Sequence, residues 1–308
     1  MRAVAVDPSV SGRLILQEVD RPSLLPSEAL IKVAAISLNR GEVRRAQTAA
    51  AGWRPGWDLA GTIETPAADG SGFPVGTRVV GFVPSGAWAE YVAVPTDAIA
   101  SLPDSVSFAD AATLPVAGLT ALHGLAKGGL LLGKSVLITG ASGGVGYFAV
   151  QLARQAGAIV TAQLRRSDWI NFIKEAGAHQ TIVGESLGEF SPYDVILDST
   201  GGTLLSNAIS AIAKDGICVT YGTTADGTVT FDAKSFYGAG GASLYGFILF
   251  HELKREPAAI GLAKLVRLLA DQRLKPHIDR TASWTEIASV AQQLSDRQFI
   301  GKAVLHLN

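Results

Sequence analysis

Apolar residues follow two different patterns along the 308-residue chain. From residue 1 to about residue 112 they come in short runs with a period of two, and turn residues such as Pro55-Gly56 separate the runs. This alternation predicts a twisted, mostly antiparallel sheet or a small barrel. The runs are MRAVAV, RLILQEV, EALIKVAAISL, DLAGTIET, TRVVGF and AWAEYVAVP.

From about residue 113 onward the expected strands are continuous and apolar, which is typical of strands that are covered on both faces. Helical stretches separate them, and the resulting order β-α-β-α-β predicts a parallel, doubly wound sheet. The strands are SVLITG, AIVTAQL, YDVILDST and GICVTYG, and the helical stretches are GYFAVQLARQAG, DWINFIKEAGA and TLLSNAISAIAKDG.

The last part of the chain returns to the first pattern. We expect a strand in ASLYGFILF, then a long helix over residues 257–274 with Pro257 in its first turn, then a helix in ASWTEIASVAQQL. The final run, GKAVLHL, again has a period of two, which predicts that the tail rejoins the first domain.

Composition excludes several classes of function. With 48% hydrophobic and 17% charged residues, the chain can bury a sizeable core. A formal net charge of -1 without a Lys/Arg-rich run disfavours binding to nucleic acid or to an acidic membrane. Cys218 is the single cysteine, so neither an intrachain disulfide nor a thiolate zinc cluster can form. We expect a soluble, cytoplasmic protein, because we find neither a signal peptide nor an uncharged apolar run of roughly 20 residues.

A glycine-rich turn, ITGASGGVG, lies between an expected buried strand and a helical stretch. Its spacing, Ala141-x-Gly143-x-x-Gly146, is the dinucleotide fingerprint with alanine in place of the first glycine. In such a turn the backbone approaches a phosphate closely, and the amides and dipole of the helix face the anion. The alternative is a tight bend without a ligand, but the surrounding strand–helix units favour dinucleotide binding.

The residues after AIVTAQL predict which dinucleotide binds. An NAD site usually has Asp or Glu there, about 20 residues past the glycine turn, to accept hydrogen bonds from the ribose hydroxyls. Here the strand runs into Arg165, Arg166 and Ser167, and the first acid is Asp168. Because arginine forms paired, charge-assisted hydrogen bonds with a 2′-phosphate, we predict NADPH. Alternatively, both arginines are solvated at a helix start that Ser167 or Asp168 caps.

Seven segments, in a fixed order over nearly the whole chain, carry a family resemblance. They are ISLNRGEV, RPGWDLAGTI, GAWAEYVAVP, GLTALHGL, GKSVLITGASGGVGYFAVQLARQAGA, DVILDSTGG and GICVTYGTT. Together they resemble the zinc-free, zeta-crystallin-like quinone oxidoreductases of the medium-chain dehydrogenase/reductase superfamily. The resemblance implies an α/β fold, with a doubly wound Rossmann sheet, a GroES-like domain of β-barrel type and a cleft between the two. We expect the GroES-like domain over residues 1–113 and 275–308 and the NADP-binding Rossmann domain over residues 114–274.

Alcohol dehydrogenases of this superfamily bind a catalytic zinc ion through Cys and His, and this chain departs from that pattern. Asn39 stands near the position of the first ligand, RPGWDLAG lacks a Gly-His-Glu motif, and the five histidines are scattered. We therefore predict no bound metal. Without a Lewis acid, alcohol oxidation is disfavoured, and we expect hydride donation to an activated acceptor.

The resemblance also assigns roles to single residues. Asn39, the candidate catalytic residue, would hydrogen-bond an acceptor carbonyl or the cofactor ribose, or else is a turn residue. Thr120 would approach the nicotinamide, or else start a helix. Lys302, in GKAVL, would approach the cofactor, or else lie at the surface. The expected cofactor-binding residues are Asn39, Thr120, Ser142, Gly143, Gly144, Val145, Arg165, Arg166, Ser167, Ser199, Thr200, Gly222, Thr223, Phe247, Leu249 and Lys302.

Four of these residues follow expected strands at the carboxyl edge of the sheet, where ligands bind in such folds. They are Ser199, Thr200, Gly222 and Thr223. Phe247 and Leu249 would lie on a later strand that lines the nicotinamide in relatives, or else belong to the core or a dimer interface. The segment RRAQTAAAGWRPGW lacks the tyrosine that many relatives carry, so we assign no side chain as proton donor and consider water instead.

Three functions remain open at this point. The first is a zinc-independent, NADPH-dependent reductase of quinones or activated α,β-unsaturated carbonyls. The second is an enoyl or alkenal reductase with little quinone activity, and the third is a non-enzymatic NADPH-binding protein with a structural or regulatory role. We expect a homodimer joined through the Rossmann sheets, because the apolar strand ASLYGFILF would form an exposed sheet edge.

Overall fold

The computed structural model describes residues 1–187 and 192–307, and the chain divides into two compact units. The first unit comprises Met1–Leu119 with Leu253–Asn308, and the second unit comprises Thr120–Glu252. The second unit ends at Glu252, well before the expected end of the Rossmann domain at residue 274. The reason is that helix α9 (Ala258–Ala270) packs against strands β5 and β7 of the first unit. Each unit is described by itself below.

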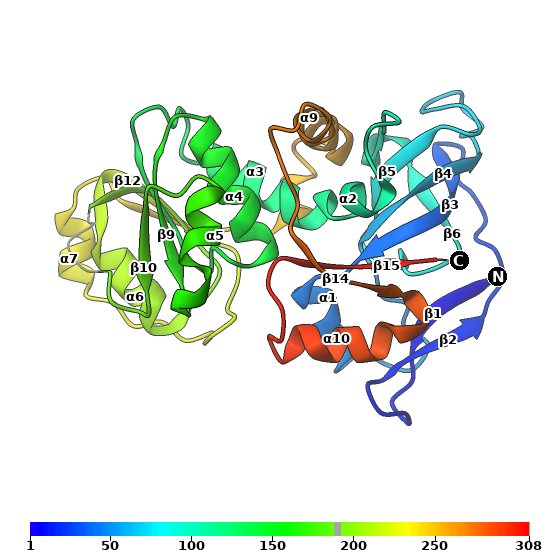
Figure 1. Cartoon of the computed structure of the whole chain (residues 1–308), viewed down its shortest axis with the longest axis horizontal. Helices are drawn as coiled ribbons and strands as arrows, with labels where there is room; N and C mark the ends of the chain where they lie inside the picture. Colours follow the sequence, from blue (N-terminus) through cyan, green and yellow to red (C-terminus); the bar gives the residue numbers. More distant parts are fainter. Residues whose placement is uncertain (188–191, 308) are drawn as a thin grey trace. The chain divides into compact units, whose positions relative to one another are not determined.

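The first unit is built on a seven-stranded sheet with the order β14-β15-β3-β4-β5-β7, in which β6 also pairs with β3 (Figure 1). These pairs are antiparallel except for β14 with β15, and β1 and β2 form a separate antiparallel pair. The strands are β1 (Arg2–Val6), β2 (Leu14–Glu18), β3 (Glu28–Ser37), β4 (Asp58–Thr65), β5 (Arg78–Phe82), β6 (Tyr91–Pro95), β7 (Ile99–Ser101), β14 (Ile278–Ser283) and β15 (Lys302–His306).

Mostly short helices lie against these strands. Helix α2 packs against β3 and β4, and α10 packs against α1, β14 and β15. A single turn of π-helix, η2, follows α2 directly and precedes the boundary with the second unit. The helices of the first unit are α1 (Arg40–Ala46), η1 (Thr96–Ala98), α2 (Phe108–Ala112), η2 (Leu114–Gly118), α9 (Ala258–Ala270), η4 (Trp284–Glu286) and α10 (Ile287–Ser295).

The period-two runs supply the core of the first unit, as their alternation predicts. Ile31, Ile36 and Leu59 are fully buried between the strands and the helices. The last strand, β15, pairs antiparallel with β3, with Val304 opposite Ser37, and Figure 1 shows it in red beside the blue N-terminal strands. The C-terminal tail is therefore part of the sheet of the first unit.

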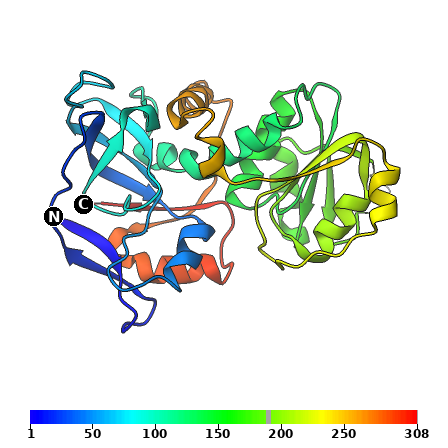
Figure 2. The same cartoon turned by 180° about the vertical axis from the view of Figure 1, so that it is seen from behind.

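The second unit is a six-stranded sheet with the order β10-β9-β8-β11-β12-β13, and all of its pairs are parallel. This confirms the expected doubly wound α/β fold. Helix α4 packs against β8 and β9, and α6 packs against β12; Figures 1 and 2 show the sheet and its helices from opposite sides. The strands are β8 (Ser135–Ile138), β9 (Ile159–Leu164), β10 (Gln180–Val183), β11 (Tyr193–Asp198), β12 (Ile212–Thr220) and β13 (Ser243–Gly246). The helices are α3 (Leu119–Ala126), α4 (Gly144–Gln155), η3 (Ser167–Trp169), α5 (Ile170–Glu175), α6 (Gly202–Ser210), α7 (Ala233–Gly238) and α8 (Leu249–Glu252).

One expected strand is shorter than its apolar run. In ASLYGFILF the strand β13 ends at Gly246, and Phe247 adds one further hydrogen bond, from its amide to Thr220 O at 2.9 Å. Leu249 was expected on this strand, but it begins helix α8, in which the His251 amide donates to Ile248 O. The expectation for Leu249 was wrong because a short apolar run does not distinguish a strand from the start of a buried helix.

The glycine-rich turn joins β8 to α4 with very little space. Gly140 has a φ of +59°, and the Gly143 amide donates to Gly140 O at 2.9 Å, which closes the turn. Gly146 is buried in the first turn of α4, where an added Cβ would lie 2.5 Å from Gly140 O and 2.7 Å from Ala141 Cα. The helix can therefore approach the strand end only because residue 146 has no side chain.

This geometry predicts the effect of Gly146→Ala. The methyl group would meet backbone atoms that cannot rotate away, so we expect a loss of about 1–3 kcal/mol in the free energy of unfolding, measured with urea. Gly227→Ala is the matched control, because an added Cβ there meets nothing within 4 Å. We expect it to change stability by less than about 1 kcal/mol. Equal stability of both variants would contradict the close packing of α4 on the turn.

Candidate functional site

In the second unit, the start of helix α4 presents backbone amides after the glycine turn. Gly143 is the N-cap residue, and no side chain caps this helix end in the described structure. Ser142, Gly144 and Val145 are partly exposed. Because the first amides of a helix lack partners within the helix, they suit an anionic group such as a pyrophosphate. The structure thus brings the four expected residues of the turn together at one uncapped helix end.

The turn lies where the order of the strands reverses. The chain runs from β8 outward to β9 and β10, and then crosses to β11 on the other side of β8. Ligands bind in open α/β sheets at such a switch point, beyond the carboxyl ends of the strands. Ser199 and Thr200 follow β11 at this point, and Ser199 Oγ donates to Thr139 O, at the end of β8, at 3.2 Å. These two expected residues therefore lie beside the glycine turn.

A buried carboxylate that the sequence analysis did not single out organises this edge. Asp198, the last residue of β11, is fully buried. It accepts hydrogen bonds from Thr139 Oγ1 and Thr200 Oγ1 at 2.7 Å each, and from the Gly201 amide at 3.1 Å. Several donors thus hold the carboxylate in place of a cation, and they fix the loop after β11 against the loop after β8.

The other expected residues of the second unit differ in exposure. Gly222 lies against Ser199, since an added Cβ would be 2.8 Å from Ser199 O, whereas Thr223 is exposed. Thr120, in helix α3, is buried, and so are Phe247 and Leu249. The last two residues are 5% and 6% exposed, in the range of core residues.

The residues after β9 are exposed. Arg165, Arg166 and Ser167 all lie at the surface, and the guanidinium of Arg166 contacts the carboxylate of Asp168. The side chains of Arg166 and Asp168 are 62% and 50% exposed, so this ion pair is weak and open to exchange with another anion. Neither η3 nor α5 has a side-chain cap, so the expected capping by Ser167 or Asp168 is wrong, whereas the exposure of both arginines agrees with the rest of that alternative.

In the first unit, Asn39 lies in a network of buried charges. It precedes α1, in which Glu42 Oε1 accepts a hydrogen bond from the backbone N–H of Asn39 at 2.7 Å, as in a capping box. The side-chain Nδ2 of Asn39 donates to Asp58 Oδ2 at 2.8 Å and to Glu42 Oε1 at 3.1 Å. Lys302 Nζ donates to Asn39 Oδ1 at 2.6 Å and to Leu38 O at 2.9 Å, and lies 3.4 Å from Asp58 Oδ2.

This network joins four parts of the first unit that are distant in sequence. Asp58 begins β4, Lys302 begins β15, and Asn39 lies between β3 and α1. The second oxygen of Asp58 accepts a hydrogen bond from the Val116 amide of η2 at 2.9 Å. Asp58 and Glu42 are fully buried and Lys302 is 3% exposed, so the alternative of a surface lysine at position 302 is wrong.

Charge balance decides the protonation of this network. Burial raises the pKa of Glu42 well above its usual value, and the negative charge of Asp58 raises it further, while Lys302 opposes the shift. Burial also raises the pKa of Asp58, but Lys302 and the hydrogen bond from Asn39 oppose that rise. One ammonium group can balance only one carboxylate, and Glu42 Oε2 has no hydrogen-bond partner among the described residues. We therefore assign the ion pair to Asp58 and Lys302, and the proton to Glu42.

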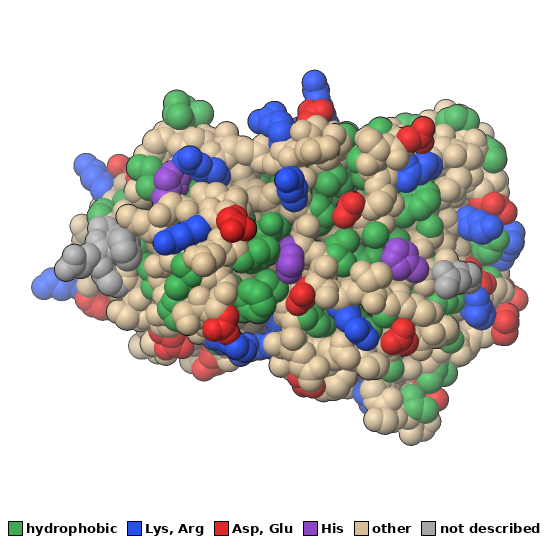
Figure 3. Space-filling model, viewed as in Figure 1, with side chains coloured by type: hydrophobic (Ala, Val, Ile, Leu, Met, Phe, Trp, Pro, Cys, Tyr) green, Lys and Arg blue, Asp and Glu red, His purple; other side chains and the backbone are tan. Residues whose placement is uncertain are grey.

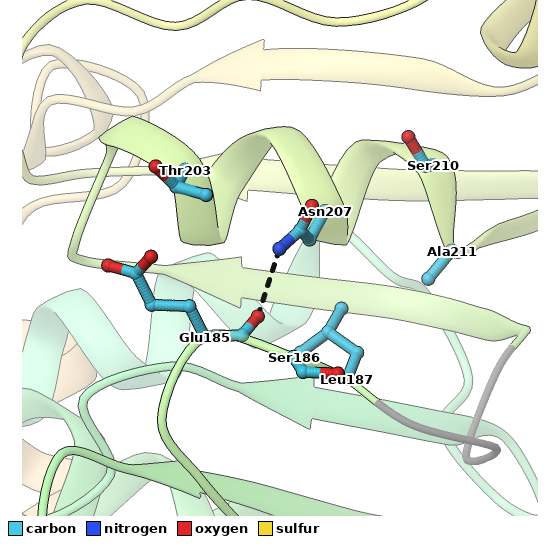
Figure 4. Close-up of a pocket in the computed structure, with 7 residues that line it drawn as sticks. All are labelled: Glu185, Ser186, Leu187, Thr203, Asn207, Ser210 and Ala211. Atoms are coloured by element: carbon cyan, nitrogen blue, oxygen red, sulfur yellow. Dashed lines mark hydrogen bonds between the residues drawn. The ribbon is translucent and has the colours of Figure 1, made fainter.

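A hollow at the surface of the second unit does not coincide with these residues. Figure 4 shows it beside α6, where Asn207 Nδ2 donates to Glu185 O at 3.0 Å. It is lined by Glu185, Ser186, Leu187, Thr203, Asn207, Ser210 and Ala211, and none of the expected site residues is among them. Figure 3 shows acidic and basic side chains interspersed over the face that it presents.

Comparison with known proteins identifies the family. A model described as the alcohol dehydrogenase GroES-like domain matches residues 25–104, and one described as zinc-binding dehydrogenase matches residues 144–264. This chain belongs to the medium-chain dehydrogenase/reductase superfamily. Within the superfamily it is quinone oxidoreductase-like, and it is an NAD(P)H-dependent oxidoreductase, as the members of that group are.

Three similar proteins illustrate this placement. A 2-methylene-furan-3-one reductase of Solanum lycopersicum is 28% identical over 306 residues, which cover 92% of this chain and 73% of that protein. A chloroplastic quinone oxidoreductase of Triphysaria versicolor is 37% identical over 200 residues, which cover 59% of this chain and 60% of that protein. The structure of an Escherichia coli quinone oxidoreductase complexed with NADPH covers 100% of both chains with a TM-score of 0.90, and at 20% identity it shows the shared fold.

The residues of this superfamily member do not fit the zinc site of its alcohol dehydrogenases. The described residues contain no group of three or more His, Cys, Asp or Glu side chains that could hold a metal ion. Of the two buried acids near Asn39, Asp58 already pairs with the ammonium of Lys302 at 3.4 Å, and a zinc site needs nitrogen or sulfur ligands in a tetrahedral set. In the part of the chain that is described, no helix is long and apolar enough to cross a membrane.

The assigned proton predicts a pH dependence for Glu42→Gln. The folded protein holds a proton on Glu42 that the unfolded chain releases above about pH 4.5, so the wild type loses stability as the pH rises from there toward the raised pKa. The substituted glutamine does not titrate. We therefore expect the variant to gain in stability relative to the wild type as the pH rises, by up to about 1.4 kcal/mol per pH unit.

Urea unfolding of both proteins between pH 5 and pH 8 measures this difference. If the two stability curves run parallel over that range, Glu42 carries its charge in the folded protein, and the assignment of the proton is wrong.

Proposed function

We propose that this protein is an NADPH-dependent reductase of quinones or activated α,β-unsaturated carbonyls that transfers hydride without zinc. One combination of features supports the proposal. Helix α4 begins without a side-chain cap after the dinucleotide turn, and the network around Asn39 contains the ion pair of Lys302 and Asp58 and no metal-binding set among the described residues. A site without a Lewis acid suits acceptors that are already electrophilic, rather than alcohols.

Residues of the second unit would hold the cofactor. The amides of Ser142, Gly143, Gly144 and Val145 bind the pyrophosphate, and the loops that Asp198 fixes border it. Arg165, Arg166 and Ser167 bind the 2′-phosphate, with Arg166 exchanging the Asp168 carboxylate for the phosphate.

In the first unit, Asn39 is the residue that would hydrogen-bond an acceptor carbonyl or the cofactor ribose. When bound, NADPH supplies a hydride to the acceptor, and reduction of a quinone is then completed by a proton from water.

A second function is favoured by one finding. The name of the tomato relative describes reduction of a 2-methylene-furan-3-one, whose activated C=C bond is conjugated with a carbonyl. An enoyl or alkenal reductase with little quinone activity is therefore the alternative.

A substrate panel distinguishes these functions. We expect stopped-flow oxidation of NADPH with quinones and with activated enones, and none with simple alcohols or ketones. Incubation with a chelator should leave the rates unchanged, and elemental analysis should show no stoichiometric zinc. Turnover of enones alone would support the alternative, and oxidation of NADPH by no acceptor would indicate a non-enzymatic binding protein. Stoichiometric zinc whose removal abolishes activity would contradict zinc independence.

The cofactor preference is tested by replacing both Arg165 and Arg166 with alanine. A hydrogen bond to a charged group contributes about 1.5–3 kcal/mol, so we expect the Kd for NADPH to rise roughly tenfold to a hundredfold. Binding of NADH should change little, because it lacks the 2′-phosphate. Lys214→Ala, an exposed cation of the same unit, is the matched control and should alter neither Kd. Equal losses for both cofactors in calorimetric titrations would mean that the arginines do not bind the 2′-phosphate.

We also propose that two copies of the chain pair through β13. This strand lies at the edge of the parallel sheet, so one side of its backbone has no neighbouring strand in the sheet order. Leu244 on β13 and Ile248 after it are 44% and 64% exposed. An exposed apolar strand edge is usually covered, and a second copy supplies a matching edge.

Sedimentation tests this homodimer. We expect the wild type to sediment as a dimer at micromolar concentration, and Leu244→Lys with Ile248→Lys to sediment as a monomer. The control is Leu25→Lys, which replaces a leucine of the first unit that is 64% exposed and should leave the dimer intact. A monomeric wild type would rule out the proposal.

A further inference from the structure

Gln163 is a buried polar side chain in the mostly apolar strand β9. It stands directly before Leu164, the last residue of the strand, and it is 4% exposed. Burying an amide side chain costs free energy unless its polar atoms find hydrogen-bond partners. The partners of Gln163 therefore show what this side chain contributes to the edge of the sheet.

The oxygen atoms of Gln163 hold the start of the glycine turn. The side-chain Oε1 accepts a hydrogen bond from the Gly140 amide at 3.0 Å, and the backbone oxygen accepts one from the Ala141 amide at 3.0 Å. The carbonyl of Gly140 in turn accepts a hydrogen bond from the Gly143 amide. Both sides of Gly140 are thus bound, one to Gln163 and the other within the turn that precedes α4.

The side-chain nitrogen of Gln163 holds the segment that leaves β9. Nε2 donates to Gly184 O at 2.8 Å and to Leu164 O at 3.0 Å, and the Gly184 amide donates to Leu164 O at 3.0 Å. The carbonyl of Leu164 and the amide of Arg165 belong to one planar peptide unit. These hydrogen bonds therefore also fix the direction in which residue 165 leaves the strand.

The three partners determine which way the amide of Gln163 points. The opposite orientation would place Nε2 against the Gly140 amide and Oε1 against two carbonyl oxygens, which joins donor to donor and acceptor to acceptor. In the observed orientation both hydrogens of Nε2 are used. Because Gln163 is also buried, its effect on a bound molecule must pass through the backbone segments that it holds.

We infer that Gln163 is a positioning residue for the cofactor: it holds the glycine turn and the segment of residues 165–167 at a fixed separation, and it thereby sets the preference of the second unit for a nucleotide with a 2′-phosphate. The inference rests on the proposed function, in which the turn binds the pyrophosphate and the arginines bind the 2′-phosphate. A ligand that spans both places gains affinity from each of them only where their separation matches the ligand, and a separation fixed beforehand reduces the entropic cost of binding.

Amide hydrogen exchange tests the contact with the turn in the absence of a ligand. Gln163→Met keeps the length of the side chain and removes both polar atoms, so the Gly140 amide should exchange roughly tenfold faster than in the wild type. The Ala141 amide is the internal control, because its acceptor is the backbone oxygen of residue 163, which the substitution leaves in place. Unchanged exchange at Gly140 would overturn the inference.

Calorimetric titration of the full chain with two nucleotide fragments tests the preference. ADP-ribose 2′-phosphate contains both the pyrophosphate and the 2′-phosphate, whereas ADP-ribose lacks the 2′-phosphate. We expect the wild type to bind the first fragment more tightly, and we expect Gln163→Met to reduce the ratio of the two Kd values about three- to tenfold. If both Kd values rise by the same factor, Gln163 supports the turn alone and the inference is wrong. It is also wrong if neither Kd changes.

Thr161→Val is the matched control. Thr161 lies two residues before Gln163 on the same face of β9, is 2% exposed, and donates from Oγ1 to Gln180 Oε1 of β10 at 3.2 Å. The variant removes a buried hydrogen bond of the same sheet and none at the turn, so it should lower stability without changing the ratio of the Kd values. An equal fall of the ratio in this variant would mean that the preference follows the stability of the sheet, which contradicts the inference.

A second variant covers the case in which Gln163→Met does not fold. Gln163→Asn keeps the amide group but is one methylene shorter, so it cannot reach Gly140 and Gly184 together. It should reduce the ratio of the Kd values in the same direction, and an unchanged ratio would count against the inference in the same way.

The inference and the proposed function fail in different ways. Absence of NADPH oxidation with any acceptor would reject the reductase function and leave the binding measurements valid. Equal affinity of the wild type for both fragments would reject the assignment of the arginines and the inference with it. A preference that is lost when Arg165 and Arg166 are both replaced with alanine, but persists in Gln163→Met, would reject the inference alone.

Discussion

The first unit depends on the buried ion pair between Asp58 and Lys302. These residues are 244 positions apart, and their contact joins the start of β4 to the start of the last strand. Removing one partner of a buried pair typically costs about 3–5 kcal/mol, because the other charge stays buried without compensation. The same two groups bind Asn39 and the Val116 amide, so the geometry of the candidate site and the closure of the sheet rest on one interaction.

The second unit fixes its own candidate site without a cation. Asp198 is buried among hydroxyl and amide donors from two loops, and Gly146 lets α4 approach the same edge of the sheet. Both devices act at the point where the strand order reverses, where the fold leaves the amides of a helix end accessible. Neutral hydroxyl and amide donors satisfy this buried carboxylate, so it is held in place without a lysine or arginine partner.

The fold was predictable because its signals are local. Period-two runs and continuous apolar strands follow directly from which faces are covered, and the spacing of Gly143 and Gly146 reflects contacts within one turn. The error at Leu249 arose where four apolar residues in a row carry no period. The roles of Glu42 and Asp58 were not predictable from the sequence. They depend on the charge of Lys302, which lies far from both residues along the chain.

The network around Asn39 shows how a buried lysine can hold side chains in a fixed geometry. A zinc ion would hold its ligands in a fixed geometry and also polarise a substrate oxygen. Lys302 performs the first task, because three acceptors converge on its ammonium group in a buried place. It cannot perform the second task, because a buried ammonium with all of its donors engaged offers no open position to a substrate. The buried ammonium group therefore fixes the side chains around it and does not itself contact a bound molecule.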